Sequence, residues 1–325
     1  MNDEAWTAQF ESPLADVLIE FIRLKRACGY RFKEEERALR CLDRFLVRSD
    51  LTERTLSRDV VDAWVARRPH ESAGNHHCRV RRTRAIAEFA RRQGVVAHVP
   101  CRPARLVSGQ HFVPRVFTFE EIGRLLIAAD ALDAPKGSQL RRVVFPVAIR
   151  VLYSCGLRLG ELQRLKVEDV DLEKGILMIL DTKFRKDRLV PVSNRLRERL
   201  CAYSAAAGHR RPDDIFFCSR HGGKYGHAAY YWAFRDVLRA AGIGHGGRGH
   251  GPRLHDLRHT MAVHRLIKWY RAGVNLNAML PVLAAYLGHQ SLAGTQRYLR
   301  CTGELYPDIV ARLEGWVGKA LSEAR

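Results

Sequence analysis

Hydrophobic periodicity in the first third of the chain predicts helices. Apolar residues recur at steps of three and four within residues 13–48 and again within residues 56–93. This spacing places apolar side chains on one face of an α-helix, where they can pack against a core. The positions that carry the pattern most clearly are Leu14, Val17, Leu18, Phe21, Ile22, Leu39, Leu42, Phe45 and Leu46. We therefore predict an all-α N-terminal third.

The remaining two thirds combine helices with a small sheet. Thr118 followed by Glu121 resembles a helix-opening capping box, which predicts a helix up to Ala131. Two short apolar runs, at 175–180 and 188–192, predict strands that form a hairpin around residues 181–187. Further helices are expected at 141–154, 194–206, 227–241, 255–270, 278–287 and 305–321. The fold class is mainly α with a small β-sheet, in an α+β domain.

Periodicity lapses between residues 99 and 114, which predicts a linker. Pro100, Pro103, Gly109 and Pro114 interrupt regular structure in this stretch. We therefore expect a helical domain at 1–100, a linker at 101–115 and a second domain at 116–325 that ends in a C-terminal helix.

Charge favours a polyanionic partner. The chain has 55 Lys and Arg against 35 Asp and Glu, a formal net charge of +20, and this balance suits nucleic acid. An arginine-rich part of the N-terminal third is either a solvated face or a surface that contacts phosphates. Its members are Arg79, Arg81, Arg82, Arg84, Arg91 and Arg92.

The same composition argues against a membrane location. The acidic N-terminus lacks the apolar segment of a secretory signal, and Pro146 and Arg150 interrupt the longest apolar stretch. No basic amphipathic helix or lipid anchor is evident. We expect a protein of the bacterial cytoplasm, associated with DNA.

Four separated motifs carry candidate chemistry. They are Gly156-Leu157-Arg158-Leu159-Gly160-Glu161-Leu162, Thr182-Lys183, His255-Asp256-Leu257-Arg258-His259-Thr260, and Leu287-Gly288-His289 with Tyr298 nine residues on. In this order they resemble the motif set of tyrosine recombinases, the phage integrase family. The resemblance implies an enzyme that cleaves and rejoins DNA to integrate, excise or transpose a mobile element.

The two motif arginines suit phosphoryl transfer. Attack at a phosphodiester spreads negative charge over the non-bridging oxygens, and preorganised cationic donors stabilise that charge. A guanidinium stays charged and can bond two phosphate oxygens, so we expect Arg158 and Arg258 at the phosphate. Glu161, three residues after Arg158, is expected to orient its guanidinium through an ion pair.

The leaving 5′ oxygen requires a proton, which a lysine on the hairpin can supply. Lys183 and Lys186 both lie in the hairpin segment, and the family pattern favours Lys183. His255, three residues before Arg258, can reach the same phosphate from one helix face. His289 can donate a further hydrogen bond or move protons near neutral pH.

Tyr298 is the expected nucleophile, because it stands at the family's distance from His289. Its phenol would attack phosphorus to form a 3′-phosphotyrosyl link and release a 5′-hydroxyl. That link conserves the bond energy, so neither ATP nor any other cofactor is expected. The arginines supply the positive charge, so no metal is expected either.

Two other functions remain open at this stage. His255 and His259 have the spacing of a helical zinc motif, with His264 as a third ligand, but Asp256 stands where such enzymes have glutamate. An inactive relative would bind DNA with a steep salt dependence and form no covalent adduct.

The resemblance also implies an assembly. Relatives of this kind suggest double-stranded DNA clamped between the two domains, with a homotetramer joining two sites. The 31 residues from Arg258 to His289, more than simple integrases have, hint at a transposon-borne subgroup that acts with sister recombinases.

Overall fold

A computed structural model describes residues 10–30, 32–102, 114–133, 140–180, 187–208, 211–247, 251–289, 291–296 and 298. The chain divides into two compact units, residues 1–111 and 112–325, and each unit has its own hydrophobic core. The dividing point lies within the segment 101–115 that the sequence predicts as a linker. Residues 103–113 of that segment, the hairpin residues 181–186 and the C-terminal helix expected at 305–321 lie outside the described residues.

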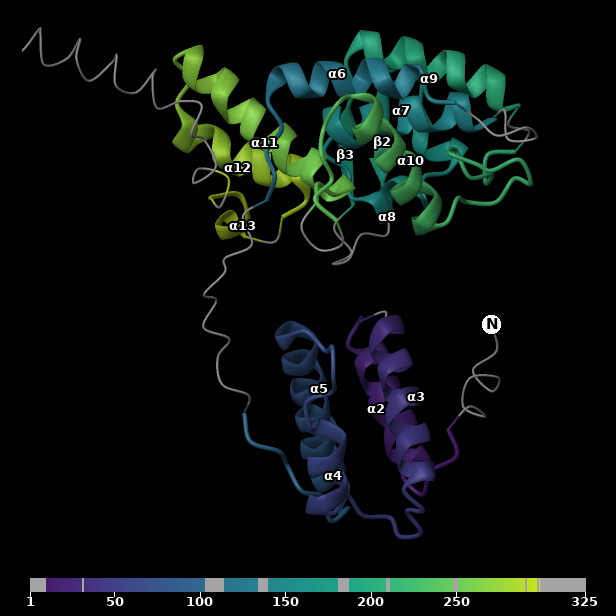
Figure 1. Ribbon diagram of the computed structural model, residues 1–325, viewed down its shortest axis with the longest axis vertical. Coiled ribbons are helices and arrows are strands. Elements are labelled where there is room, and N and C mark those ends of the chain that lie inside the picture. Colours follow the sequence, from purple (N-terminus) through teal and green to yellow (C-terminus); the bar gives the residue numbers. More distant parts are fainter. Residues whose placement is uncertain are drawn as a thin grey trace, which may run out of the picture. The chain divides into compact units, whose positions relative to one another are not determined.

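The described part of the N-terminal unit is helical, as predicted (Figure 1). Its helices are α2 (Ala15–Ala27), α3 (Lys33–Arg48), α4 (Arg58–Val65) and α5 (Ala73–Arg92). Each of the two periodic segments therefore contains two helices. Gly29, with a positive φ of 87°, separates α2 from α3, and the Ser57 and Ser72 side chains cap the starts of α4 and α5.

Arg79 corrects the predicted arginine surface. Its side chain is buried and donates to the Glu71 carboxylate and to the carbonyls of Trp64 and Ala66. It stabilises the turn between α4 and α5 and is not available to a phosphate. Arg81, Arg91 and Arg92 are exposed.

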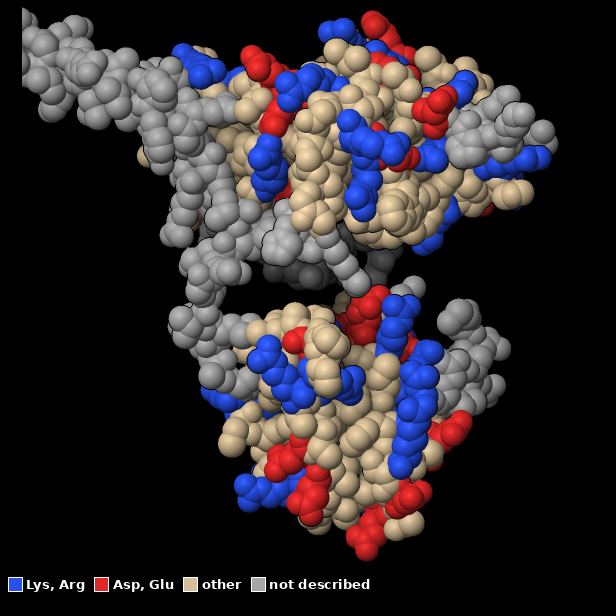
Figure 2. Space-filling view, viewed as in Figure 1, with Lys and Arg blue, Asp and Glu red and all other residues tan. Residues whose placement is uncertain are grey.

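Arg82 and Arg84 are half-buried. Arg84 donates to Glu88 at 3.0 Å and to the carbonyl of Pro100, so part of its donor capacity is used within the unit. Figure 2 shows basic and acidic side chains interspersed on the visible face of each unit.

In the C-terminal unit, helices surround a three-stranded sheet (Figure 1). The helices that precede the sheet are α6 (Phe119–Asp130), α7 (Leu140–Ser154) and the short α8 (Leu159–Leu162). After the sheet come α9 (Asn194–Ala207), α10 (His227–Ala240), α11 (Leu254–Arg271), α12 (Leu276–Leu287) and α13 (Leu292–Gln296). The structure confirms the capping box of Thr118 and Glu121 at the start of α6.

The predicted hairpin is present as β2 (Ile176–Ile179) and β3 (Arg188–Pro191), which pair antiparallel. Leu177 pairs with Val190, and both side chains face the core. A third strand, β1 (Val170–Asp171), pairs with the other side of β2 and is not predicted from the sequence. A strand this short has too few residues to show an alternating pattern.

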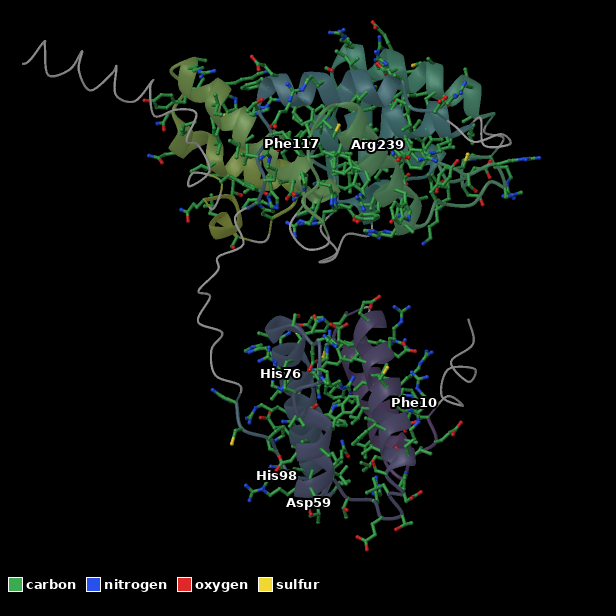
Figure 3. The ribbon with its side chains drawn as sticks, in the orientation of Figure 1. Phe10, Asp59, His76, His98, Phe117 and Arg239 are labelled. Carbon is green, nitrogen blue, oxygen red and sulfur yellow. The ribbon has the colours of Figure 1, made fainter. Side chains whose placement is uncertain are left out.

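The start of the C-terminal unit is attached to α11 by polar contacts. The Phe117 backbone N–H donates to Thr260 at 3.1 Å, and the Phe117 carbonyl lies 2.9 Å from His264 Nε2. Figure 3 labels Phe117 beside the start of α6. Among the described residues, no helix is long and apolar enough to cross a membrane.

The buried position of Arg79 predicts a large effect on stability. Arg79→Ala should lower the free energy of unfolding by about 3 kcal/mol, because it leaves the Glu71 carboxylate without its buried partner. Arg81→Ala, two residues along the same helix but exposed, should change it by less than about 0.5 kcal/mol. Urea unfolding of both variants measures the difference, and equal effects would contradict the assignment.

Candidate active site

The site is organised around the C-terminal end of α12. Gly288 ends the helix in the left-handed conformation, with φ of 66°. The N–H groups of Gly288 and His289 satisfy the carbonyls of Ala284 and Ala285. The next carbonyls lack partners within the helix, and the negative end of the helix dipole favours cations beside them.

Three arginines from distant segments occupy these positions. Arg188 Nε donates to the Tyr286 carbonyl at 2.9 Å, and Arg258 Nη2 donates to the Leu287 carbonyl at 2.6 Å. Arg158 Nη2 donates to the Gly288 carbonyl at 3.2 Å. One helix end therefore gathers guanidinium groups from the start of α8, from β3 and from α11.

Arg258 is the most deeply buried of the three. Its side chain belongs to the first turns of α11 and is 1% exposed, and its Nη1 also donates to the Gly156 carbonyl at 2.5 Å. Burial and the nearby Arg158 charge lower the pKa of Arg258 to about 10, so it stays protonated at neutral pH. Gly156 has φ of 60°, and a Cβ there would overlap the Met261 side chain. A larger residue at this position would therefore disturb the hydrogen bond between the Gly156 carbonyl and Arg258.

Glu161 joins two of the arginines, as the sequence predicted for Arg158. Its Oε1 lies 2.7 Å from Arg158 Nη1, and its Oε2 lies 2.8 Å from Arg188 Nη2. Burial raises the pKa of Glu161, but the hydrogen bonds and charges of Arg188 and Arg158 lower it by more. The resulting pKa is about 2. The carboxylate is therefore ionised at every physiological pH.

The histidines lie beside this arginine cluster. His255 and His259 are one turn apart on α11, with ring centroids 4.7 Å apart. The rings of His259 and His289 lie 5.5 Å and 5.9 Å from the Tyr298 ring. Burial of His255 and His289, together with the positive charges beside them, lowers the pKa of each imidazole to about 4. Both histidines are therefore neutral at pH 7.

Tyr298 lies against the same groups. Its side chain is 3% exposed and packs with Met261 and Leu287. The charge of Arg258 interacts with the tyrosine hydroxyl. His289 is oriented by a 2.8 Å contact between its Nδ1 and Thr295 Oγ1. Four predicted site residues, Arg158, Arg258, His289 and Tyr298, thus occupy one region, and His255 adjoins it through His259.

Two neighbours of the site are not among the predicted site residues. Arg188 is predicted only as part of a strand, although a charged residue that opens a buried strand is a signal for an internal partner. His259 is predicted only as a zinc ligand in the alternative function, but it lies between His255 and Tyr298. Lys183 and Lys186 lie outside the described residues.

His264 does not fit the zinc alternative. Its Nδ1 lies 2.8 Å from the Tyr153 hydroxyl, its Nε2 contacts the Phe117 carbonyl, and its ring stacks on Phe119 at 3.7 Å. Both ring nitrogens are therefore already used, one by Tyr153 of α7 and the other by the Phe117 carbonyl before α6. The described residues contain no group of three His, Cys, Asp or Glu side chains that could hold a metal ion.

An α+β unit in which buried arginines and histidines surround a tyrosine is typical of enzymes that transfer DNA strands through that tyrosine. The phage integrase family model matches residues 115–304. The chain is 33% identical over 315 residues to the integrase/recombinase y4rB of Sinorhizobium fredii, covering 91% of this chain and 95% of that protein. It therefore belongs to the phage integrase family and is a tyrosine recombinase.

Other similar proteins are also named as recombinases or integrases. The tyrosine recombinase XerD of Ralstonia nicotianae is 29% identical over 302 residues, covering 86% of this chain and 90% of that protein. The Tn1549 transposon integrase, solved with transposon right end DNA, has a TM-score of 0.60 at 17% identity, covering 87% of this chain and 94% of that one. The XerH recombinase, solved with its difH substrate after cleavage, has a TM-score of 0.58 at 19% identity, covering 79% and 71%.

Glu161 should make stability depend on pH. Its folded pKa of about 2 lies below the ordinary value of 4.5, so the ionised carboxylate stabilises the fold above that value, by at most about 3 kcal/mol. This contribution is lost as pH falls from 4.5 through the folded pKa. Denaturant unfolding of wild type and Glu161→Gln should therefore differ most above about pH 5 and converge toward pH 2.

Glu168→Gln is the matched control, since it removes an exposed carboxylate that pairs with Lys166 at 2.7 Å. It should cost less than about 1 kcal/mol. A difference between wild type and Glu161→Gln that stays constant over this pH range would rule out the linkage.

Proposed function

We propose that this tyrosine recombinase cleaves and rejoins double-stranded DNA through a 3′-phosphotyrosyl link at Tyr298, in order to integrate, excise or transpose a mobile element. The observation that carries the proposal is the position of the Tyr298 ring, which contacts His259 and His289 and interacts with Arg258. A nucleophile, a neutral imidazole at His289 and a buried cation thus lie together. The DNA-bound relatives support DNA as the substrate.

The arginines would bind the phosphate that is cleaved. Arg158 is 30% exposed at its side chain, whereas Arg258 is buried, so an incoming phosphate would meet Arg158 first. Both guanidiniums are already fixed by carbonyls, so they need little reorganisation when charge develops on the phosphate oxygens. The loss of one such donor typically costs about 3–4 kcal/mol of transition-state stabilisation.

The bond changes follow from these positions. The Tyr298 oxygen attacks phosphorus and loses its proton to a neighbouring neutral imidazole, while the bond to the 5′ oxygen breaks. Lys183 gives its proton to that oxygen, and the 5′-hydroxyl departs. Attack by another 5′-hydroxyl reverses these steps, so rejoining consumes no ATP. His255 donates to the bound phosphate.

The assembly on DNA belongs to the same proposal. We expect the N-terminal unit to contact phosphates through Arg81, Arg82, Arg84, Arg91 and Arg92, without Arg79, while four copies pair two DNA sites in the bacterial cytoplasm. Two integrase/recombinases of one Sinorhizobium fredii strain, y4rB and y4rE, are each similar to this chain, at 33% and 32% identity. That pair supports a system in which sister recombinases act together.

Replacement of the nucleophile tests the chemistry. The substrate is a set of nicked duplexes tiled across the DNA that flanks the gene, because a nick lets the short product leave and traps the adduct. Wild type should form a covalent adduct on a denaturing gel, and Tyr298→Phe should form none while its gel-shift affinity is unchanged, since only the attacking oxygen is lost.

Tyr203→Phe is the control, because it removes a buried tyrosine hydroxyl that donates to the Phe216 carbonyl and not to a candidate site residue. It should retain the adduct. An adduct that persists in Tyr298→Phe would refute the assignment, and DNA binding without any wild-type adduct would support an inactive relative. Activity lost to a chelator and restored by zinc would support the metallohydrolase.

The identity of the general acid can be tested through the leaving group. Lys183→Ala should slow adduct formation on ordinary DNA, by about 100-fold or more, because the 5′ oxygen then leaves unprotonated. A duplex with sulfur at the bridging 5′ position should restore the rate, since a thiolate leaves without a proton. Lys186→Ala should cleave both substrates like wild type, and the opposite pattern would transfer the role to Lys186.

A further inference from the structure

Arg188 occupies the point where three parts of the site meet. It is the first residue of β3, directly after the segment that contains Lys183, and its side chain is 8% exposed. Its Nη1 and Nη2 donate to the two carboxylate oxygens of Glu161 at 3.2 Å and 2.8 Å, while its Nε donates to the Tyr286 carbonyl. One planar group therefore connects the hairpin, α8 and the end of α12.

The space around Arg188 is closely fitted. A Cβ placed on Gly288 would lie 2.9 Å from Arg188 Nη1. The same Gly288 presents its carbonyl to Arg158, so Arg188 lies beside the backbone that holds the phosphate-binding guanidinium. A change in the position of Arg188 would therefore reach Arg158 by two routes, through Glu161 and through Gly288.

The charges of the cluster also require Arg188. Glu161 is ionised and pairs with both arginines, so a single negative charge faces three guanidiniums, those of Arg158, Arg188 and Arg258. Without Arg188, Glu161 would keep only its ion pair with Arg158, and the carboxylate that orients Arg158 would lose its second anchor. The positive charge of Arg188 also acts on Arg258 and His289.

We propose that Arg188 is a positioning residue for DNA cleavage: its fork holds Glu161, and through it Arg158, in register with the base of the hairpin and the end of α12. The inference rests on the proposed function and deepens it. The Nε, Nη1 and Nη2 atoms of Arg188 already bond to the Tyr286 carbonyl and to Glu161, whose carboxylate offsets the charge of Arg188, so Arg188 acts through Arg158.

The experiment compares the chemical step with binding. Arg188→Gln and Arg188→Lys are assayed in the full chain on the nicked duplex that wild type cleaves, for the single-turnover rate of adduct formation and for the affinity. Arg188→Gln should cleave about 10–100-fold more slowly, as expected for partners that orient a functional group. Its affinity should change less than about threefold, because most binding comes from other phosphate contacts.

Arg188→Lys should recover only part of the rate. An ammonium keeps the positive charge but cannot bond both oxygens of Glu161 and the Tyr286 carbonyl with a rigid fork. Full recovery would mean that charge alone matters and would overturn the positioning role.

Arg150→Gln separates positioning from general damage to the fold. Arg150 is a buried arginine of α7 that pairs with Asp130 at 2.6 Å and donates to the carbonyls of Pro146 and Leu126, without contacting a site residue. Its replacement should lower the melting temperature about as much as Arg188→Gln while leaving the cleavage rate near that of wild type. Equal slowing in both variants would reduce Arg188 to a structural role.

The pH dependence of cleavage gives a second readout. The hydrogen bond from Arg188 is the largest of the influences that lower the pKa of Glu161, so Arg188→Gln should raise that pKa. The variant should then lose cleavage rate as pH falls through the raised pKa, in a range where the wild-type rate shows no such loss. If the cleavage rates of wild type and Arg188→Gln fell identically at acidic pH, the inference would be contradicted. Failure of wild type to form any adduct would instead reject the proposed function itself.

Discussion

The end of α12 is the constraint on which the site depends. Helix termination at Gly288 leaves carbonyl groups that the helix cannot satisfy, and Arg188, Arg258 and Arg158 supply the missing donors. Each arginine comes from a different segment, so the hydrogen bonds that complete one helix also align α8, β3 and α11. The guanidinium groups are therefore held in place by the protein itself, and such preorganisation is the condition for efficient electrostatic stabilisation of a transition state.

Burying several guanidiniums together is costly unless their donors are satisfied. Here carbonyl dipoles and the carboxylate of Glu161 compensate part of the charge, and the remainder stays positive where a phosphate would bind. Burial, together with the same positive environment, lowers the pKa of His255 and His289 to about 4 and keeps both neutral at pH 7. Stability and catalytic readiness therefore depend on the same contacts.

The helix that carries His255 and Arg258 is also held at its middle. Thr260 and His264 of α11 bind the backbone of Phe117, where the chain enters the C-terminal unit. His264 therefore has a structural use, which explains a third histidine on this helix without a metal. The same helix thus positions two candidate site residues and the entry of the unit.

Local sequence signals determined much of this protein. Periodicity and capping residues predicted the helices and the β2–β3 hairpin, since these depend on neighbours a few residues apart, and the ordered motifs indicated the family and most of the site. Only the tertiary structure decided the partners of the arginines. Arg79 lies within α5 and binds Glu71, eight positions away, whereas Arg188 opens β3 and binds Glu161 across 27 positions of sequence. A charged side chain has the same appearance in sequence whether it faces solvent or an internal carboxylate, because the partner is set by packing between distant segments.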